Sequence, residues 1–387
     1  MHESALEAAR ELLANFAGLP GSEAEAPGRV NLIGEHTDYN GGLVLPAALA
    51  QRTAVAVRFS DGSRVRGVSR EEGAAESELE APPGRAWLDY VRGVALELSA
   101  THRIPRRGFD VAVAGEVPGG SGLSSSAALE VATALALGAA ADRPFRSDEA
   151  LDLARLCQRA ESGFVGVPCG ILDPFASLLA REGEAILLDC ARMTWETVPL
   201  PTRLELVIVD TGVRRALREG GYKTRREECE QALESSRGVL ARTIATLSEI
   251  GPHELPALRG ALPSVLYRRV RHVVTENRRV HAFANALRHA HLPVAGEALY
   301  GSHASLRDDY EVTCDESDLL VEQSRTLPGV VGARMTGAGW GGCTVHLVES
   351  DHAQEVLERL QAGFAARFGQ VPRAWRTRPG PGARISG

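Results

Sequence analysis

A strand-like segment, a loop rich in glycine and serine, and a long apolar stretch follow one another between residues 109 and 141. Phe109–Ala114 reads as a strand, and the loop after it reads Pro118-Gly-Gly-Ser-Gly-Leu-Ser-Ser-Ser-Ala-Ala-Leu-Glu. Glycines let a backbone come close to an anion, and the N–H groups that begin the next helix can bind it. Three consecutive serines add hydroxyls that suit phosphate or magnesium. The unit predicts a phosphate-binding loop, although many ordinary turns have a similar composition.

Lysine is almost missing from this chain, because Lys223 is the only one and arginine takes its place elsewhere. A Walker-type nucleotidase needs the lysine of GxxxxGK[ST], and a protein kinase needs a lysine on a strand. The neighbours of Lys223, Gly-Gly-Tyr-Lys-Thr-Arg-Arg, fit neither motif. Any phosphoryl transfer here must therefore use another architecture.

Length and charge narrow the class of protein. A chain of 387 residues favours two domains over one core. Its net charge of -7 argues against nucleic acid or an anionic membrane as partner, since both need a positive field. No signal pattern or membrane-length apolar run is present, so we expect a cytoplasmic protein. The cysteines form no CxxC pair and are expected to be reduced core thiols rather than zinc ligands or disulfides.

Hydrophobic patterns outline the order of the elements. Strands are expected at Arg29–Ile33, Thr53–Phe59, Arg64–Val68, Phe109–Ala114, Ala185–Asp189, Leu204–Asp210, Gly332–Met335 and Cys343–Val348. Helices are expected up to about Phe16, at Trp87–Leu98, Asp148–Glu161, Pro174–Ala180 and Ala353–Phe368, and over most of Tyr222–Leu327. A soft domain boundary is expected near residues 190–200. The tail, Arg378–Gly387, is rich in glycine and proline and is expected to be loose.

Charged residues crowd into the string Gly28-Arg-Val-Asn-Leu-Ile-Gly-Glu-His-Thr-Asp-Tyr-Asn-Gly-Gly. Carboxylates and an imidazole packed this closely suit a polyhydroxylated ligand, since sugar hydroxyls need both donors and acceptors. The alternative is a polar hairpin with a satisfied histidine. A third string, Met335-Thr-Gly-Ala-Gly-Trp-Gly-Gly-Cys-Thr, implies a backbone pressed against a ligand or another loop, or else a strained hairpin.

Taken together, these strings resemble the galactokinases of the GHMP kinase superfamily. The similarity continues through Phe164-Val-Gly-Val-Pro-Cys-Gly-Ile-Leu-Asp, Tyr222-Lys-Thr-Arg-Arg and Ser302-His-Ala-Ser-Leu-Arg-Asp-Asp-Tyr, so it covers nearly the whole chain in order. The resemblance implies an α/β (α+β), two-lobed GHMP kinase fold with the active site in the cleft between the lobes. It implies an N-terminal domain at 1–195, a C-terminal domain at 196–387, and a protein that is a monomer.

The resemblance also implies roles for particular residues. Asp173 corresponds to the catalytic base beside the anomeric hydroxyl, and Arg29 to the arginine next to it, which would favour the ionised carboxylate and offset charge on the phosphoryl group. The residues that correspond to galactose contacts are Glu35, His36, Asp38, the backbone of Thr37, and Tyr222. Magnesium would be held by Ser126 and Glu161. The phosphates of ATP would lie against Gly120, Ser121, Gly122, Leu123, Ser124, Ser125 and Ser126, with Ser69 and Trp87 near the rest of the nucleotide.

Two departures from the family pattern bear on these expectations. Pro174 follows the base where glutamine is common, and proline fits the first turn of a helix. Ala338 and Trp340 interrupt the third string where Gly-Gly-Gly-Phe is usual, and Ala338 is harmless only if its φ is negative.

Two other functions stay open. One is a sugar- and ATP-responsive regulator without catalysis, which loss of the base or of the serine loop would favour; both are present. The other is a sugar-1-kinase for N-acetylgalactosamine or arabinose, because pocket shape discriminates such sugars by only ~1–3 kcal/mol per methyl-sized group. The string Glu35-His36-Thr37-Asp38 favours galactose as the substrate, and the family resemblance implies ATP as the phosphoryl donor and magnesium as the cofactor.

Overall fold

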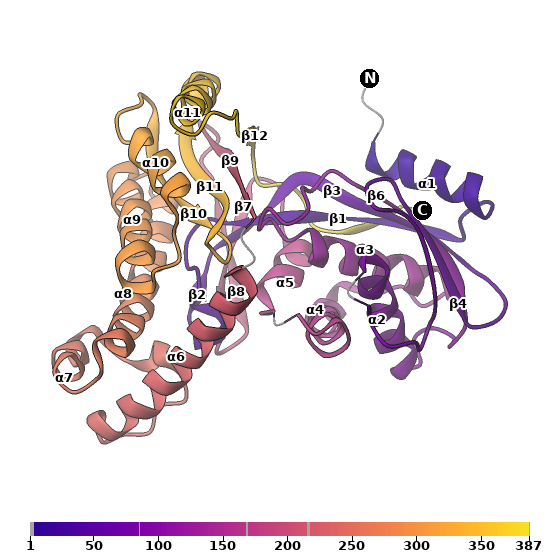
Figure 1. Cartoon of the computed structure of the whole chain (residues 1–387), viewed down its shortest axis with the longest axis horizontal. Coiled ribbons are helices and arrows are strands. Elements are labelled where there is room, and N and C mark those ends of the chain that lie inside the picture. Colours follow the sequence, from indigo (N-terminus) through magenta and orange to yellow (C-terminus); the bar gives the residue numbers. More distant parts are fainter. Residues whose placement is uncertain (1–3, 85, 168, 215–216, 387) are drawn as a thin grey trace.

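The computed structural model describes residues 4–84, 86–167, 169–214 and 217–386. Figure 1 shows a broad sheet between helices at one end of the molecule, and long helices with a smaller sheet at the other. The first end is built mainly from the first half of the chain, and the second end from the second half. Pro168, in one of the strings compared with the family, lies outside the described residues.

The largest sheet has six strands in the described residues, in the spatial order β13-β1-β3-β6-β4-β5. Its neighbouring strands are antiparallel except for the parallel pair β4 and β6. The strands are β1 (Ser22–Asn31), β3 (Pro46–Phe59), β4 (Arg64–Ser69), β5 (Gly73–Glu78), β6 (Phe109–Gly115) and β13 (Arg384–Ser386).

Alternating alanine and valine gives this sheet two different faces. Successive side chains of a strand point to opposite faces. The alanine face carries Ala54, Ala56, Ala112 and Ala114, and the valine face carries Val55, Val57, Val111 and Val113. Helix α1 (Ala5–Phe16) packs on the alanine face, whereas α2 (Trp87–Ala100) and α3 (Ser125–Ala140) cover the opposite face (Figure 1). Small side chains let α1 approach closely, and the larger valines fill the core beneath α3.

Helix α3 is apolar almost all round, which is typical of a helix inside a core. Beside it lie α4 (Ala150–Arg159), a π-helical turn η3 (Ala160–Val165) and α5 (Leu172–Leu179). A small sheet in the order β2-β7-β8 follows, made of β2 (Leu43–Val44), β7 (Glu184–Asp189) and β8 (Thr194–Pro199). These elements carry the chain from the first half to the second.

The second half builds an antiparallel sheet in the order β10-β11-β9-β12. Its strands are β9 (Leu204–Arg214), β10 (Val330–Thr336), β11 (Gly341–Glu349) and β12 (Arg373–Thr377). Its helices are α6 (Leu217–Leu240), α7 (Leu255–Arg259), α8 (Ser264–Arg288), α9 (Leu292–Ser305), α10 (Asp315–Ser324) and α11 (Ala353–Phe368). Short 3-10 turns are η1 (Asp38–Asn40), η2 (Ser147–Glu149), η4 (Leu247–Glu249), η5 (Pro252–Glu254) and η7 (Ser350–His352), and η6 (Leu306–Tyr310) is a second π-helical turn.

The expectation of a loose C-terminal tail was wrong. Strand β13 pairs with the edge of β1, and the N–H of Gly380 donates to the carbonyl of Ala48 at 2.9 Å. Arg384 donates from Nε to the buried carboxylate of Glu25 at 2.7 Å. The edge of β1 and the charge of Glu25 both need partners, and the tail supplies them.

The predicted boundary between residues 195 and 196 stays a prediction. Strand β8 runs across it, and β13 returns from the end of the chain to the first sheet.

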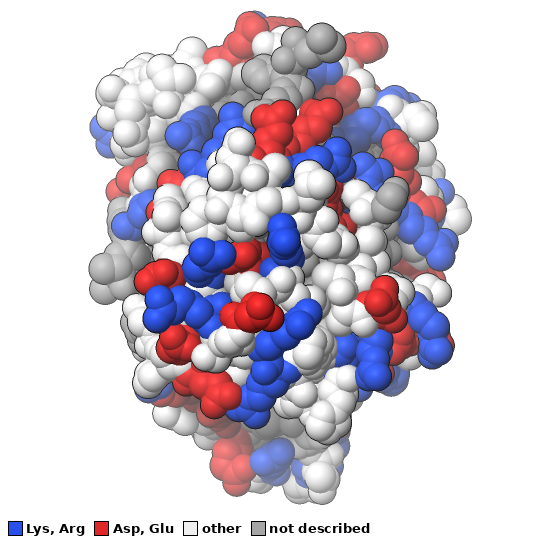
Figure 2. Space-filling view, turned by 90° about the vertical axis from the view of Figure 1, so that its right-hand side faces the viewer, with Lys and Arg blue, Asp and Glu red and all other residues white. Residues whose placement is uncertain are grey.

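Charges of both signs are interspersed on the face that Figure 2 shows, which is the end of the molecule with α1 and β4. Ion pairs of these two elements include Arg10–Glu23, Arg64–Glu78 and Arg66–Asp110. In the described residues, no helix is long and apolar enough to cross a membrane. All six cysteines are free, and Cys157, Cys229, Cys314 and Cys343 are buried.

Candidate active site

Three predicted site residues from distant parts of the chain meet at the carboxylate of Asp173. Arg29, in β1, donates from Nε to Oδ1 at 2.8 Å, and its Nη2 lies 2.7 Å from the same oxygen. Ser124, just before α3, donates from Oγ to Oδ2 at 2.6 Å. Asp173 is the second residue of α5, where the helix dipole also favours a negative charge. Both oxygens are held in place, and the side chain is still 27% exposed, so a substrate can reach it.

The phosphate loop between β6 and α3 is fastened to β1. Arg29 donates from Nη1 to the carbonyl of Gly122 at 2.6 Å, and its backbone N–H donates to Leu123 at 3.0 Å. Gly120 and Gly122 have φ values of 67° and 84°, which favour glycine, and Ser124 adopts 59°. No described side chain caps the start of α3, so its first N–H groups can bind an anion. This geometry is compatible with phosphate binding, and the phosphate roles of these residues stay predictions.

The second half of the chain also reaches this loop. A Cβ placed on Gly120 would lie 3.4 Å from Nε of Arg214, at the end of β9. Asp210 accepts two hydrogen bonds from Arg214, at 2.6 and 2.9 Å, and orients it. Ser121 is fully buried and donates to the carbonyl of Pro118 at 2.7 Å, which shapes the loop. Arg214 is thus a fixed cation beside the loop that the sequence analysis did not single out.

Glu161 and Ser126 meet beside Asp173. Glu161 lies in η3 and is buried. Burial, and next the negative charge of Asp173, raise the pKa of Glu161 to about 6. The nearby side chains of Cys169 and Ser126 act to lower this pKa. No group of three or more His, Cys, Asp or Glu side chains in the described residues could hold a metal ion. One carboxylate and one hydroxyl nevertheless suit a magnesium ion that takes its other ligands from phosphate and water.

Glu35 joins the sugar-binding string to β10 and the glycine loop. Its Oε2 accepts from Asn31 Nδ2 at 2.6 Å and from Arg334 Nη1 at 2.7 Å. Its Oε1 accepts from Thr336 Oγ1 at 3.1 Å and from the N–H of Gly337 at 2.7 Å. Burial raises the pKa of Glu35, and the charge of Arg334 opposes this. Four donors on two oxygens make this carboxylate a rigid junction between the two halves of the chain.

His36 is held as a neutral ring. Its φ is 62°, its Nε2 lies 3.1 Å from the carbonyl of Ala338, and its Nδ1 lies 2.9 Å from the hydroxyl of Tyr39. Burial lowers the pKa of His36 to about 3. A neutral imidazole has one donor and one acceptor, so Nε2 donates to the carbonyl and Nδ1 accepts from Tyr39. Tyr310, 3.0 Å from Tyr39, extends this chain of hydrogen bonds.

Asp38 and Tyr222 lie close to these groups. Asp38 is half-buried, and burial raises its pKa to about 6. The N–H of Tyr39 opposes this rise in the pKa, and the charge of Asp173 adds to it. Its carboxylate lies directly against Gly170, where any side chain would collide with it. The ring of Tyr222, in α6, is centred 5.9 Å from that of His36. The predicted sugar contacts therefore surround one region.

The hydroxyl of Thr37 has a structural role. It donates to the carbonyls of Gly34 and Leu43 at 2.8 and 2.7 Å. The carbonyl of Thr37 accepts the N–H groups of Asn40 and Gly42 at 3.0 and 2.7 Å, so the predicted backbone contact falls to its N–H. Ser69 accepts the N–H groups of Glu71 and Glu72 in its own turn, both at 3.2 Å. The nucleotide roles suggested for Ser69 and Trp87 stay predictions.

The departures from the family pattern fit the structure. Pro174 is the third residue of α5, within the first turn, where it costs no hydrogen bond. Ala338 is not among the described residues with positive φ, whereas Trp340 has φ 53°. The N–H of Trp340 donates to Val312 at 2.6 Å, and its ring lies against Gly221 of α6. Trp340 thus connects the glycine loop to the helix that carries Tyr222.

Sequence reasoning missed some groups at the site. Ser124 was expected at the phosphates, a role that stays a prediction, and its bond to Asp173 was not foreseen. Arg334 was not singled out, although an arginine between apolar residues of a buried strand signals a buried ion pair. Tyr39 and Tyr310 could be found only from their hydrogen bonds.

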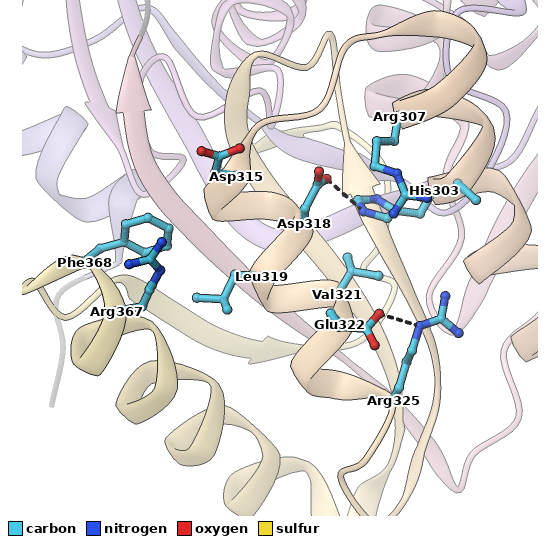
Figure 3. A pocket seen from close by; sticks show the side chains of 11 residues that line it. His303, Arg307, Asp315, Asp318, Leu319, Val321, Glu322, Arg325, Arg367 and Phe368 are labelled. Carbon is cyan, nitrogen blue, oxygen red and sulfur yellow. Dashed lines mark hydrogen bonds and ion pairs between the residues drawn. The ribbon is translucent and has the colours of Figure 1, made fainter.

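A cavity of about 510 Å³ lies away from these residues, lined by side chains of α9, α10 and α11. In Figure 3, Asp318 points to His303 at 3.2 Å and Glu322 to Arg325 at 3.0 Å, so charges that line it pair with one another. None of the predicted site residues lines this cavity.

Three family models match the chain. Residues 15–59 match the model described as galactokinase galactose-binding signature. Residues 89–181 match the GHMP kinases N terminal domain, and residues 283–366 match GHMP kinases C terminal. The matched ranges contain the sugar-binding string, the phosphate loop and the glycine loop, respectively.

Curated relatives and solved structures agree with these matches. The chain is 42% identical to a galactokinase of Chloroflexus aggregans, over 92% of this chain and 91% of the relative. It is 41% identical to the galactokinase of Homo sapiens, over 92% of this chain and 91% of the relative. A solved structure of Lactococcus lactis galactokinase complexed with galactose superposes with a TM-score of 0.91 at 35% identity, and covers 97% of this chain and 98% of its own.

Proposed function

This chain belongs to the galactokinase family and has the two-domain GHMP kinase fold, as the sequence predicted, and we propose that it transfers a phosphoryl group from ATP to the anomeric hydroxyl of galactose. The observation that carries this proposal is the contact of Arg29 and Ser124 with Asp173 beside the sugar-binding string. A fixed, partly exposed carboxylate next to a guanidinium suits the removal of a proton from a bound hydroxyl. The chain is a phosphotransferase of the sugar kinase type.

Asp173 acts on the sugar and Arg29 on the charge that develops. The anomeric hydroxyl gives its proton to Asp173, its oxygen bonds to the γ-phosphorus of ATP, and ADP leaves. Arg29 is held by Asp173 and by the carbonyl of Gly122, so it sits between the base and the phosphate loop. Positioning and electrostatic stabilisation supply most of the acceleration in phosphoryl transfer. Ser124 holds the second oxygen of Asp173 and fixes the direction of proton transfer.

The sugar hydroxyls are recognised by a ring of acceptors and donors. Asp38 supplies a carboxylate, Thr37 its backbone and Tyr222 a phenol. In this proposal Glu35 and His36 also line the sugar, and their hydrogen bonds to protein partners fix where they stand. A site built to hydrogen-bond hydroxyls rejects analogues that lack them, because buried polar groups are then left unpaired. The rigid bonding of Glu35 and His36 to the glycine loop keeps this arrangement in place before the sugar binds.

The phosphate loop would hold ATP together with its magnesium ion. Ser126 and Glu161 are the residues that would hold the ion, which when bound neutralises charge on the phosphates. Residues 120–126 supply backbone N–H groups and hydroxyls to the phosphates, and Ser69 lies farther along the nucleotide. Arg214 adds a cation from the second half of the chain.

The remaining expectations follow from the same premise. The enzyme acts in the cytoplasm, as a monomer, in the first committed step of galactose metabolism. Its two domains cover residues 1–195 and 196–387, and its partners are galactose and ATP rather than nucleic acid or a membrane.

Release of ADP by the purified chain with Mg-ATP across a sugar panel tests the proposal. Galactose, glucose, N-acetylgalactosamine, arabinose and mevalonate form the panel, with controls lacking sugar or containing EDTA. We expect EDTA-sensitive turnover with galactose well above the others. Faster turnover with N-acetylgalactosamine or arabinose would move the specificity, and binding of galactose and ATP without turnover would favour a regulator.

A further inference from the structure

Glu130 is a fully buried carboxyl that the reaction outlined above does not use. It lies in α3, four residues after Ser126, and therefore one helical turn farther along the same face. In the described residues, neither of its carboxylate oxygens has a hydrogen-bond partner. Burial, and next the charges of Glu161 and Asp173, raise its pKa well above the ordinary value. Glu130 thus adjoins the pair expected to hold magnesium.

Glu35 and Glu276, two other buried glutamates near the site, are saturated with donors. Glu35 accepts four hydrogen bonds, and Glu276 accepts from Gly34, Ser302 and Arg279. Buried polar groups are normally satisfied, and one without a partner indicates a missing water or ion. Glu130 therefore differs from these two glutamates, since both of its carboxylate oxygens lack a partner in the described residues.

A cation held at Ser126 and Glu161 would supply the missing donors through the water bound to it. Magnesium keeps several of its waters when protein provides few ligands, and these waters need acceptors. No set of three carboxylates in the described residues closes around a metal, so Glu130 is placed for contact through water rather than direct ligation. The neighbouring thiols of Cys157 and Cys169 are only weak donors and do not replace such a water.

We propose that Glu130 is a positioning residue of the divalent-cation site, accepting hydrogen bonds from water bound to the cation that Ser126 and Glu161 hold. This inference rests on the proposed function for the placement of magnesium at those two residues. It adds a third oxygen group to the site, in the outer sphere, and gives a role to the one carboxyl of α3, a helix that is mostly apolar.

Binding of Mn²⁺, used as a spectroscopic probe for magnesium, tests the inference without measuring turnover. The full chain is saturated with ADP, and free Mn²⁺ is counted by electron paramagnetic resonance during a titration. In Glu130→Gln, we expect Mn²⁺ affinity to fall about 10-fold or more, because outer-sphere partners typically contribute 10–100-fold. Thermal unfolding without divalent ions checks that the variant is folded, and we expect a melting temperature no lower than that of the parent.

Thr133→Val is the matched control. Thr133 is also fully buried in α3, its hydroxyl also lacks a described partner, and it lies about 10 Å along the helix from Ser126. This variant removes an unsatisfied polar group from the same helix, and we expect unchanged Mn²⁺ affinity. If Glu130→Gln does not fold, Glu130→Asp keeps the charge and shortens its reach, and its Mn²⁺ affinity decides in the same way.

Glu161→Gln separates the two proposals. Parental Mn²⁺ affinity in Glu130→Gln, with a large loss in Glu161→Gln, overturns the inference and leaves the proposed function standing. Parental affinity in both overturns the inference together with the placement of magnesium. A loss in both, with Thr133→Val unchanged, supports the inference.

Discussion

Carboxyl groups near the site differ in charge according to the donors around them. At Glu276, burial alone raises the pKa, but Arg279 and other neighbours lower it to about 2. At Asp38, burial has the larger effect and the pKa rises to about 6. Glu161 reaches about 6 for the same reason. The groups proposed for the sugar and for magnesium therefore change charge in a range where the enzyme can be assayed.

The pH dependence of kcat/KM for galactose follows from these values. Above pH 6 Asp38 and Glu161 are charged, and below it they take up protons and lose their value as acceptor and ligand. We predict that, well below pH 6, kcat/KM falls by about tenfold or more for each pH unit. Initial rates at low galactose between pH 5 and 8 measure it. In Asp38→Asn, the pH dependence of kcat/KM that remains is due to Glu161. A parental kcat/KM that stays constant down to pH 5 would contradict the assignment of the pH dependence to these two carboxyl groups.

Residue types could be predicted from the sequence better than residue contacts. Arg29 and Asp173 stand 144 residues apart, and only the family resemblance paired them. The bond from Ser124 to Asp173 depends on a left-handed φ just before α3, which no composition indicates. Arg334 could have been predicted from the sequence, because an arginine between apolar residues of a buried strand indicates a buried ion pair. The sequence analysis considered only the glycine loop that follows it.

At the scale of elements, two π-helical turns place residues at the site. Glu161 lies in η3 after α4, and Tyr310 lies in η6 after α9. Both turns end at a residue with positive φ, Gly166 and Glu311. A π-helical turn contains an extra residue and is often found at functional sites. The sequence predicted plain helices here, because hydrophobic periodicity does not reveal one inserted residue.

Strand β10 connects the sugar-binding string to the rest of the second half through Arg334. This guanidinium is fully buried and contacts Glu35 at 2.7 Å, Ser302 at 3.1 Å and the carbonyl of Asn31 at 3.2 Å. We predict that Arg334→Met lowers the free energy of unfolding by about 3–5 kcal/mol, because it leaves Glu35 charged and buried without its cation. Denaturant unfolding measures the loss.

Arg359→Met is the control for that variant. Arg359 is 57% exposed and pairs with Glu355 at 2.8 Å on α11, and such surface pairs contribute about 0–1 kcal/mol. Equal losses in the two variants would mean that the Arg334 contacts do not hold the string in place.

Edge strands were the elements that the sequence predicted least well. Strand β5 reads Gly-Ala-Ala-Glu-Ser-Glu and β8 reads Thr-Trp-Glu-Thr-Val-Pro, and both are largely exposed. Their strand form comes from pairing with β4 and β7 rather than from a buried face. The central strands β3, β6 and β11 were predicted, because alternating or continuous apolar residues mark them.

At the scale of the whole molecule, the glycine loop lies between the two substrate-binding strings. A Cβ on Gly337 would lie 3.0 Å from the carbonyl of Gly122, and one on Gly342 would lie 2.8 Å from that of Ser121. On its other side the loop contacts Glu35 and His36. The glycines that the sequence analysis explained by a nearby ligand or loop are needed for contact with the phosphate loop. Which loop they would meet could not be predicted, since more than 200 residues separate the two.

The measurement that tests the account most directly is single-turnover phosphorylation of galactose by the parent and by Asp173→Asn, with the phosphorylated carbon identified by NMR. Asparagine keeps the size of the side chain and removes the base. We predict phosphate on the anomeric oxygen in the parent, and a rate about 10²–10⁴-fold lower in the folded variant that still binds galactose and ATP. A variant rate near that of the parent, or phosphate on another hydroxyl, would contradict the central claim.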